Sequence, residues 1–89
     1  MKCVISVLGK DHKGIIAGVA TCLAECGANI EDVSQTRLNG MFSMTMMIDL
    51  DTSIASFDET QQRLEEAGNT IGVQITIQRE DVFRFMHSV

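Results

Sequence analysis

The chain has 89 residues, a net charge of −5 and a hydrophobic content of 45%. A chain of this size and composition forms one folded domain with its own core, so we expect residues 1–89 to be a single domain rather than a disordered segment. The acidic charge and the absence of Trp and Tyr argue against direct nucleic-acid binding, which relies on cationic surfaces and aromatic stacking.

The N-terminal segment carries no signal for export or membrane insertion. Its apolar run covers residues 3–8, which is too short for the core of a signal peptide or for a membrane span. Three cysteines, Cys3, Cys22 and Cys26, are an odd number without a secretion signal, and we expect reduced thiols. The sequence therefore predicts a cytoplasmic protein with no membrane partner.

A buried strand and an amphipathic helix are predicted for the first third of the chain. Residues 2–8 are mostly apolar on both faces, which is typical of a central strand. Residues 14–26 form a helix whose apolar side chains recur at core-facing spacing. These side chains are Ile15, Ile16, Val19, Ala20 and Leu23. Gly27 then supplies the backbone freedom that ends a helix.

A β-hairpin is predicted for residues 29–50. Residues 29–38 are polar and alternate imperfectly, which favours an edge strand. Asn39 and Gly40 both tolerate a positive φ and predict a type I′ turn. Residues 41–50 alternate cleanly, and the apolar face of this strand carries Phe42, Met44, Met46, Ile48 and Leu50.

The second half of the chain repeats the order of helix and strand. A helix is predicted over residues 56–68, because Ser56 and Glu59 have capping-box spacing and Gly68–Asn69 would close it. Residues 72–79 alternate as a strand. The tail, residues 80–89, is compatible with a short amphipathic helix that would carry Val82, Phe83, Phe85 and Met86 on one side.

The predicted order is therefore βαββαβ followed by a short C-terminal helix. We expect an α+β fold, the ferredoxin-like sandwich, with a four-stranded antiparallel sheet and two helices on one face. The other face would carry Thr45, Met47, Gln74, Thr76 and Gln78, and no helix of the sandwich would cover it. Domains of this kind use such a face, or an exposed edge strand, to meet another copy or a partner.

The candidate ligand-binding unit covers residues 9–32, a glycine-punctuated loop that enters the first helix and continues to the next strand. A helix N-terminus after a strand presents unpaired N–H groups that can bind a carboxylate or a phosphate.

The segment GKDHKGIIAGVATCLAECGANIEDVSQ, followed by the hairpin and FSMTMMIDL, resembles an ACT domain, the small-molecule sensing module of amino-acid metabolism. It is most similar to stand-alone ACT-domain proteins related to the glycine cleavage system transcriptional repressor. The specific part is D-x-x-G-I, which is followed about fifteen residues after Asp11 by G-A-N-I.

The resemblance implies an amino-acid site where the first loop and helix start of one subunit meet the second strand of a neighbour. Carried over by position, the ligand-binding residues are Gly9, Asp11, His12, Lys13, Gly14, Ile15, Asn29 and Ile30. Loop N–H groups and Asp11 would bind the carboxylate and ammonium of a zwitterion. Many ACT domains carry proline where Lys13 stands, so this loop lacks a fixed φ but gains a cation.

Several of these residues have a second interpretation. Asp11 could instead be the N-cap of the helix, and Gly9 and Gly14 could serve backbone geometry alone. His12 is a conceivable metal ligand, but a lone loop histidine is more often solvated, and His87 has no companion. Cys22 and Cys26 are spaced for one helix face, yet two thiols are too few for a metal site, and core packing is favoured.

No catalytic constellation is visible in the sequence, and no cofactor or metal is predicted. The loop lacks the arginine of acylphosphatases and the paired cysteines of copper chaperones. The sequence favours a non-enzymatic regulatory domain that binds an amino acid or related metabolite at the interface of a homodimer or higher homo-oligomer. Its output would lie in a metabolic enzyme or regulator. The alternative is an oligomerising protein-interaction module with no small-molecule ligand.

Overall fold

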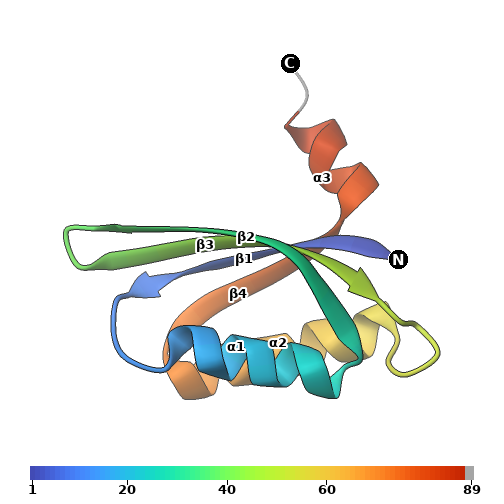
Figure 1. The fold of residues 1–89 in the computed structure, drawn as a ribbon, viewed down its shortest axis with the longest axis horizontal. Helices are drawn as coiled ribbons and strands as arrows, with labels where there is room; N and C mark the ends of the chain where they lie inside the picture. Colours follow the sequence, from blue (N-terminus) through green and yellow to red (C-terminus); the bar gives the residue numbers. More distant parts are fainter. Residues whose placement is uncertain (88–89) are drawn as a thin grey trace.

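Two helices cover one face of a four-stranded antiparallel sheet (Figure 1). The computed structural model describes residues 1–87. The elements in chain order are β1 (Lys2–Lys10), α1 (Ile15–Glu25), β2 (Ala28–Leu38), β3 (Met41–Leu50), α2 (Phe57–Ile71), β4 (Val73–Arg79) and α3 (Glu80–Met86). The strands lie in the order β2-β3-β1-β4, and all neighbours are antiparallel. This architecture confirms the predicted ferredoxin-like sandwich.

The core lies between the sheet and the helices α1 and α2. The inward side chains predicted for β3 are all buried, and β1 and β4 supply the rest of the sheet's apolar face. From α1, Ile15, Val19 and Leu23 enter this core, whereas Ile16 of the predicted stripe is exposed. The buried cluster is Cys3, Ile5, Val7, Ile15, Val19, Leu23, Phe42, Met44, Met46, Ile48, Leu50, Leu64, Val73, Ile75 and Ile77.

The β2–β3 turn sets the register of the hairpin. Asn39 and Gly40 have φ values of 52° and 78°, as the predicted type I′ turn requires. The pairing runs from Leu38 opposite Met41 to Ala28 opposite Leu50. One irregularity at Glu31 shifts the register between Ile30 and Asp32, which is the pattern of a β-bulge.

The end of α2 differs from the prediction. The helix does not close at Gly68–Asn69 but continues to Ile71, where Gly72 provides the left-handed cap with φ of 89°. Gly68 lies within α2 and is buried against β4. A Cβ at this position would lie only 2.6 Å from the carbonyl oxygen of Val73. The glycine therefore permits close approach of α2 to β4 and does not end the helix.

Ser56 caps α2 as predicted, but only this half of the capping box is present, because the Glu59 carboxylate accepts from the Ser56 hydroxyl and not from its backbone N–H. The Ser56 hydroxyl accepts a hydrogen bond from the backbone N–H of Glu59 at 3.1 Å and lies 3.2 Å from the Glu59 carboxylate. We expect Ser56→Ala to lower the free energy of unfolding by about 1 kcal/mol, because one N–H of the first turn loses its acceptor. Ser53→Ala is the matched control, since Ser53 bonds Asp51 in the preceding loop. Equal losses in urea unfolding of the two variants would contradict this role for Ser56.

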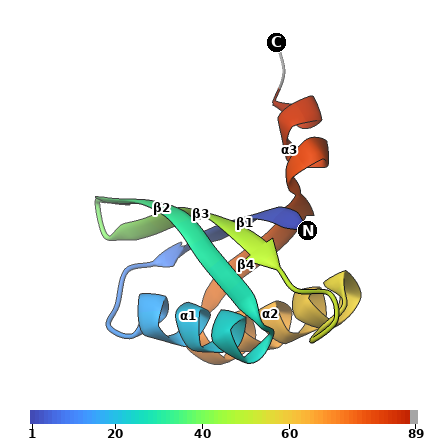
Figure 2. The same cartoon turned by 45° about the vertical axis from the view of Figure 1, so that its right-hand side comes forward.

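The tail forms a helix as predicted, but its apolar residues do not share one buried side. Figure 2 shows α3 standing out from the sheet on the side opposite to α1 and α2. None of its residues is buried. Phe83 is half-buried and stacks on His87, with ring centroids 4.2 Å apart, whereas Phe85 is exposed. The predicted tail extends to residue 89, and its last two positions lie outside the described residues.

Candidate functional site

The β1–α1 loop is shorter than predicted and is built around a glycine in the left-handed conformation. β1 continues to Lys10, so the loop covers residues 11–14. Gly14 has φ of 90° and is the N-cap residue of α1. A Cβ at Gly14 would meet no atom within 4 Å, so the positive φ and not a lack of space favours glycine here.

The N-terminus of α1 carries no side-chain cap, which corrects the interpretation of Asp11 as an N-cap. In residues 1–87, no side chain accepts a hydrogen bond from the first turn of α1, and that turn holds no acidic residue. The contrast with α2 is clear, because Ser56 caps α2 and Asp58 and Glu59 lie in its first turn. The first-turn N–H groups of α1 are therefore left for solvent or a ligand, at the positive end of the helix dipole.

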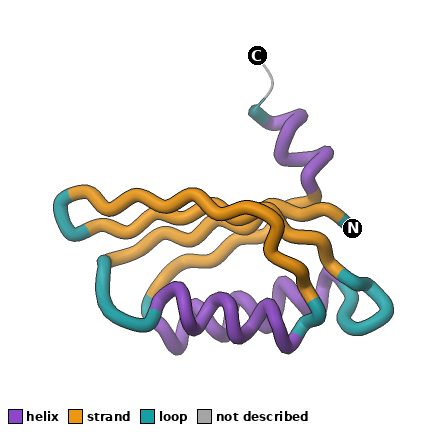
Figure 3. Tube along the Cα trace, in the orientation of Figure 1, coloured by secondary structure: helices purple, strands orange, loops and turns teal. Residues whose placement is uncertain are grey.

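Asp11 bonds the β2–β3 hairpin instead. Its backbone N–H donates to the carbonyl oxygen of Gly40 at 2.8 Å, and its carboxylate forms an ion pair with Arg37 at 3.1 Å. The Arg37 guanidinium lies 5.2 Å from the ring centroid of Phe42, its neighbour across the strands. Figure 3 shows the loop and the hairpin turn at the same end of the sheet. The site thus contains an anion and a cation beside a helix N-terminus.

Arg37 was missed by the sequence analysis. It lies 26 positions after Asp11, and only the length of the hairpin brings the two together. The available signal was that Arg37 is the only Lys or Arg in the polar strand over residues 29–38. If the C-terminal end of that predicted strand is placed beside the C-terminal end of the first strand, Arg37 comes next to the loop that leads to α1.

The other predicted loop residues have separate environments. Gly9 lies within β1, and a Cβ there would be 2.7 Å from Cγ1 of Val73, so strand packing accounts for this glycine. The Ile15 side chain is buried in the core, which leaves only its backbone for a ligand. His12 and Lys13 are exposed, and Nδ1 of His12 lies 2.9 Å from the carbonyl oxygen of Lys13.

Asn29 and Ile30 do not join the loop within one chain. They lie at the start of β2, whereas Arg37 lies near its end, and this separation corresponds to roughly 25 Å along a strand. A shared site with the loop therefore requires β2 of a second copy. From Asn29 to Leu38, every residue of β2 is exposed, which leaves this edge strand uncovered over most of its length.

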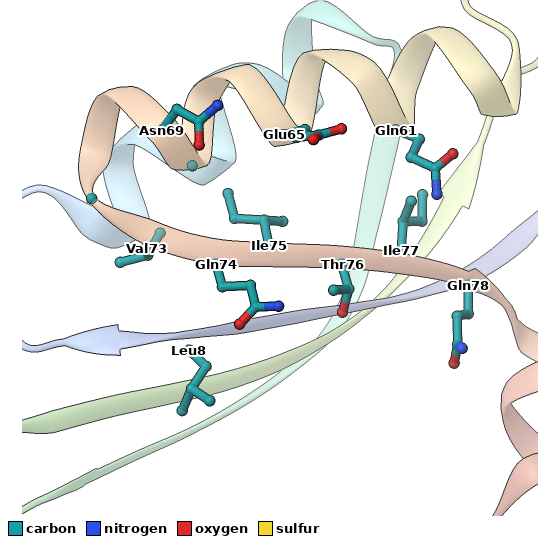
Figure 4. Close-up of a pocket in the computed structure, with 12 residues that line it drawn as sticks. Leu8, Gln61, Glu65, Asn69, Val73, Gln74, Ile75, Thr76, Ile77 and Gln78 are labelled. Carbon is teal, nitrogen blue, oxygen red and sulfur yellow. The ribbon is translucent and has the colours of Figure 1, made fainter.

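A groove of about 790 Å³ lies away from this loop, along the edge strand β4 (Figure 4). Its walls are Leu8, Gln61, Glu65, Gly68, Asn69, Gly72, Val73, Gln74, Ile75, Thr76, Ile77 and Gln78. Glu65 is the single charged residue among them. An open strip with one charge is poorly suited to a zwitterion, which needs donors and an acceptor close together. We therefore favour the β1–α1 loop, and not this groove, as the ligand site.

The cysteines do not form a metal site. Burial raises the pKa of the Cys22 thiol to about 11, and the neighbouring Cys26 adds to this rise, so Cys22 stays protonated at neutral pH. Among residues 1–87, no group of three or more His, Cys, Asp or Glu residues is placed to hold a metal ion. In the same part of the chain, no helix has the length and apolar character needed to cross a membrane.

The sequence model of the ACT domain matches residues 2–78. A UPF0237 protein of Clostridium acetobutylicum is 48% identical over 89 residues, which is all of this chain and all of the relative. The structure of an ACT domain protein from Streptococcus pneumoniae is 41% identical, with a TM-score of 0.82 over 93% of each chain.

A protein described as a glycine cleavage system transcriptional repressor has the same fold. It is 22% identical, with a TM-score of 0.76 over 86% of this chain and 44% of that protein. At this identity the likeness concerns the fold alone. The resemblance to the ACT domain that the sequence indicated is confirmed by the family match and by the pneumococcal structure.

Proposed function

Because this chain belongs to the ACT-domain family, whose members are regulatory domains that bind small molecules, we propose that it binds an amino acid or a related small metabolite. It performs no catalysis itself in this proposal. The observation that carries it is the uncapped N-terminus of α1 beside the Asp11–Arg37 ion pair. This end of the molecule offers donors for an anion and an acceptor for a cation.

The chemistry of a zwitterion matches these groups. Its carboxylate would bind the N–H groups of the first turn of α1, where the helix dipole favours an anion, and Lys13 would add positive charge. Its ammonium would bind Asp11, whose carboxylate is partly exposed and, within residues 1–87, accepts a hydrogen bond from the Nε atom of Arg37 alone. Both charged ends of an amino acid would thus find a partner within one loop.

The site would be completed by a second copy of the chain. The exposed edge of β2 supports this, because an uncovered strand of 11 residues presents free backbone groups for pairing. Ile30 and Val33 lie opposite the buried residues Ile48 and Met46 and therefore face the helix side, yet both are exposed. In this arrangement, Asn29 and Ile30 of one copy would lie beside the loop of the other in a homodimer or a higher homo-oligomer.

Ligand binding would then alter the geometry between copies, and a metabolic enzyme or regulator would respond to that change. The loop and β2 contribute to one interface, so a ligand held between them stabilises one arrangement of the two subunits over others. This coupling requires no catalytic group in the chain.

Asp11→Asn should abolish the amino-acid-induced rise in melting temperature, because it replaces the carboxylate anion that would pair with the ammonium by a neutral amide. In a thermal-shift screen of the twenty amino acids and common metabolites, a ligand at 100 times its Kd adds about 2.7 kcal/mol to the wild-type protein. For a domain of this size, that corresponds to a rise in melting temperature of more than about 10 °C. The variant should show no rise with the same compound.

Asp58→Asn is the matched control, since it removes one exposed carboxylate from α2, away from the loop. It should keep the full ligand-induced rise. The loss of the surface pair with Arg37 costs Asp11→Asn only about 0–1 kcal/mol, so both variants should fold. If no compound shifts the wild-type protein while it remains an oligomer, the result favours the interaction module without a ligand.

A further inference from the structure

The C-terminal helix α3 exposes apolar side chains that its own domain does not cover. Phe85 is 82% exposed, and Val82 and Met86 are also exposed. A helix of seven residues is not stable in water by itself and needs packing contacts. The structure therefore leaves a short helix with an uncovered apolar surface.

The contact of Met86 with the sheet and the burial of Phe83 indicate which side of α3 faces away. Met86 lies against the sheet, because its sulfur is 3.4 Å from the Gln78 side-chain nitrogen. Phe83 is half-buried and stacks on His87. Residues two apart on a helix point in nearly opposite directions, so Phe85 points away from the side that Phe83 occupies. Phe85 is thus presented to a neighbouring molecule.

The sheet face on the side of α3 has an uncharged centre. The register places one row across all four strands, formed by Ser34, Thr45, Ser6 and Thr76. The next row towards the hairpin is formed by Thr36, Ser43, Leu8 and Gln74. Eight uncharged side chains of small or moderate size lie together here, and a second such surface could pack against them without charge repulsion.

The exposed apolar side chains of β1, β2 and β3 on this face lie at the end opposite to α3, whereas Val4 and Met47, nearer α3, are buried and half-buried. Leu8 and Met41 are 51% and 48% exposed, and Leu38 pairs with Met41 beside the hairpin turn. α3 begins after Arg79, which pairs with Cys3 at the other end of β1. The face therefore has an apolar helix at one end and an apolar patch at the other.

We propose that two copies of the chain pack through this face in antiparallel orientation, with α3 of each copy against Leu8 and Met41 of the other. A two-fold axis across the strands, at the row that contains Ser6 and Thr45, exchanges the two ends of the sheet. The same rotation brings each Phe85 to the partner's apolar patch. The contact is self-complementary, as a two-fold interface requires. It uses a different face from the edge strand β2 and does not rest on the proposed ligand site.

The charges at the two ends favour the same orientation. Around α3 the acids outnumber the bases: Glu31, Asp32, Asp49, Asp51, Glu80 and Asp81 lie near Lys2, Arg79 and Arg84. At the hairpin end this face carries the cation Lys10 opposite Met41 and, among the described strand residues there, no acid, whereas Arg37 lies opposite the buried Phe42 and faces the helix side. Antiparallel packing brings the acidic end of one copy over the basic end of the other.

A stable contact needs both the sheet face and α3. β1 has nine residues, so the face measures about 30 Å along the strands and about 19 Å across four of them. This footprint alone is smaller than the roughly 800 Å² per partner that a stable interface buries, so the contacts of α3 have to supply the remainder.

Phe85→Ser and Leu8→Ser should each halve the mass of the full-length protein in light scattering after size exclusion. Both side chains are exposed in one copy, so far-UV circular dichroism should stay unchanged. Ile54→Ser, an exposed apolar residue of the loop between β3 and α2 and outside both proposed interfaces, is the matched control and should leave the mass unchanged. A monomeric wild-type protein, or an unchanged mass in Phe85→Ser, would overturn the proposal.

Cross-linking tests the geometry independently. Facing sheets pack about 10 Å apart, so Thr45→Cys beside the two-fold axis should cross-link between copies with a bismaleimide of that span. Gln62→Cys on the exposed side of α2 should not. Absence of the Thr45→Cys product would count against the arrangement. A second result would also contradict the proposal. If the wild-type protein binds phosphatidylglycerol vesicles and Phe85→Ser abolishes this binding, α3 contacts a membrane surface and not a second copy.

Discussion

Replacing Phe42 by alanine should lower the free energy of unfolding by about 3–5 kcal/mol. Phe42 has no exposed surface, and its ring belongs to the buried cluster at the hairpin end of β3. Eighty-nine residues correspond to a total stability of only about 4–13 kcal/mol at typical values per residue. The variant should therefore be largely unfolded at urea concentrations at which the wild-type protein remains folded.

Phe42→Leu is the control that separates the cavity from the loss of the aromatic ring. It keeps most of the buried volume, and we expect a loss below about 1.5 kcal/mol. It also removes the ring beneath the Arg37 guanidinium, so any effect on ligand binding would appear here without unfolding. A loss as large as that of the alanine variant would contradict a packing explanation. Protein concentration must be equal in all samples, since oligomers gain stability with concentration.

Gly68→Ala should also destabilise the protein, by about 1–3 kcal/mol, although alanine is the better helix former. Helix propensity alone predicts a gain of up to about 1 kcal/mol. The added Cβ would lie 2.6 Å from the backbone oxygen of Val73, and a backbone atom of β4 cannot rotate aside as the end of a side chain can. The steric cost therefore exceeds the gain, and urea unfolding should show a lower midpoint.

Gly18→Ala gives the matched comparison on α1. Its Cβ would lie 2.5 Å from Cδ1 of Ile71, which is the far end of a flexible side chain that can rotate. We expect the packing cost and the helix-propensity gain to cancel to within about 0.5 kcal/mol. If both variants lose the same free energy of unfolding, the stability change does not depend on whether the new methyl group meets a backbone atom or a side-chain atom.

The sequence predicted those parts of the fold that depend on local patterns. Period-two alternation identified β3 and its buried face, and Asn39–Gly40 identified the hairpin turn. The end of α2 was predicted wrongly because a glycine that allows close packing and a glycine that caps a helix look alike in sequence. Only the position of β4 beside Gly68 distinguishes them, and this contact is tertiary.

The candidate site was predictable only in part for the same reason. The loop and its helix start could be located from glycines and polar residues next to an apolar run. The role of Asp11 could not be decided, since capping a helix and pairing with a distant arginine require the same residue type. The choice depends on where Arg37 lies, and that follows from the hairpin length and register. The uncapped state of α1 likewise became visible only in three dimensions.

The hydrogen bond from Asp11 to Gly40 has a mechanical consequence. It fastens the loop to the tip of the hairpin, and the residues on either side of that tip, Leu38 and Met41, lie on the opposite face of the sheet. The hairpin turn thus connects the loop on one side of the sheet to the apolar patch on the other side. The coupling must be reciprocal. If a molecule bound at the loop stabilises contacts made by that patch, those contacts strengthen the binding of the molecule by the same free energy.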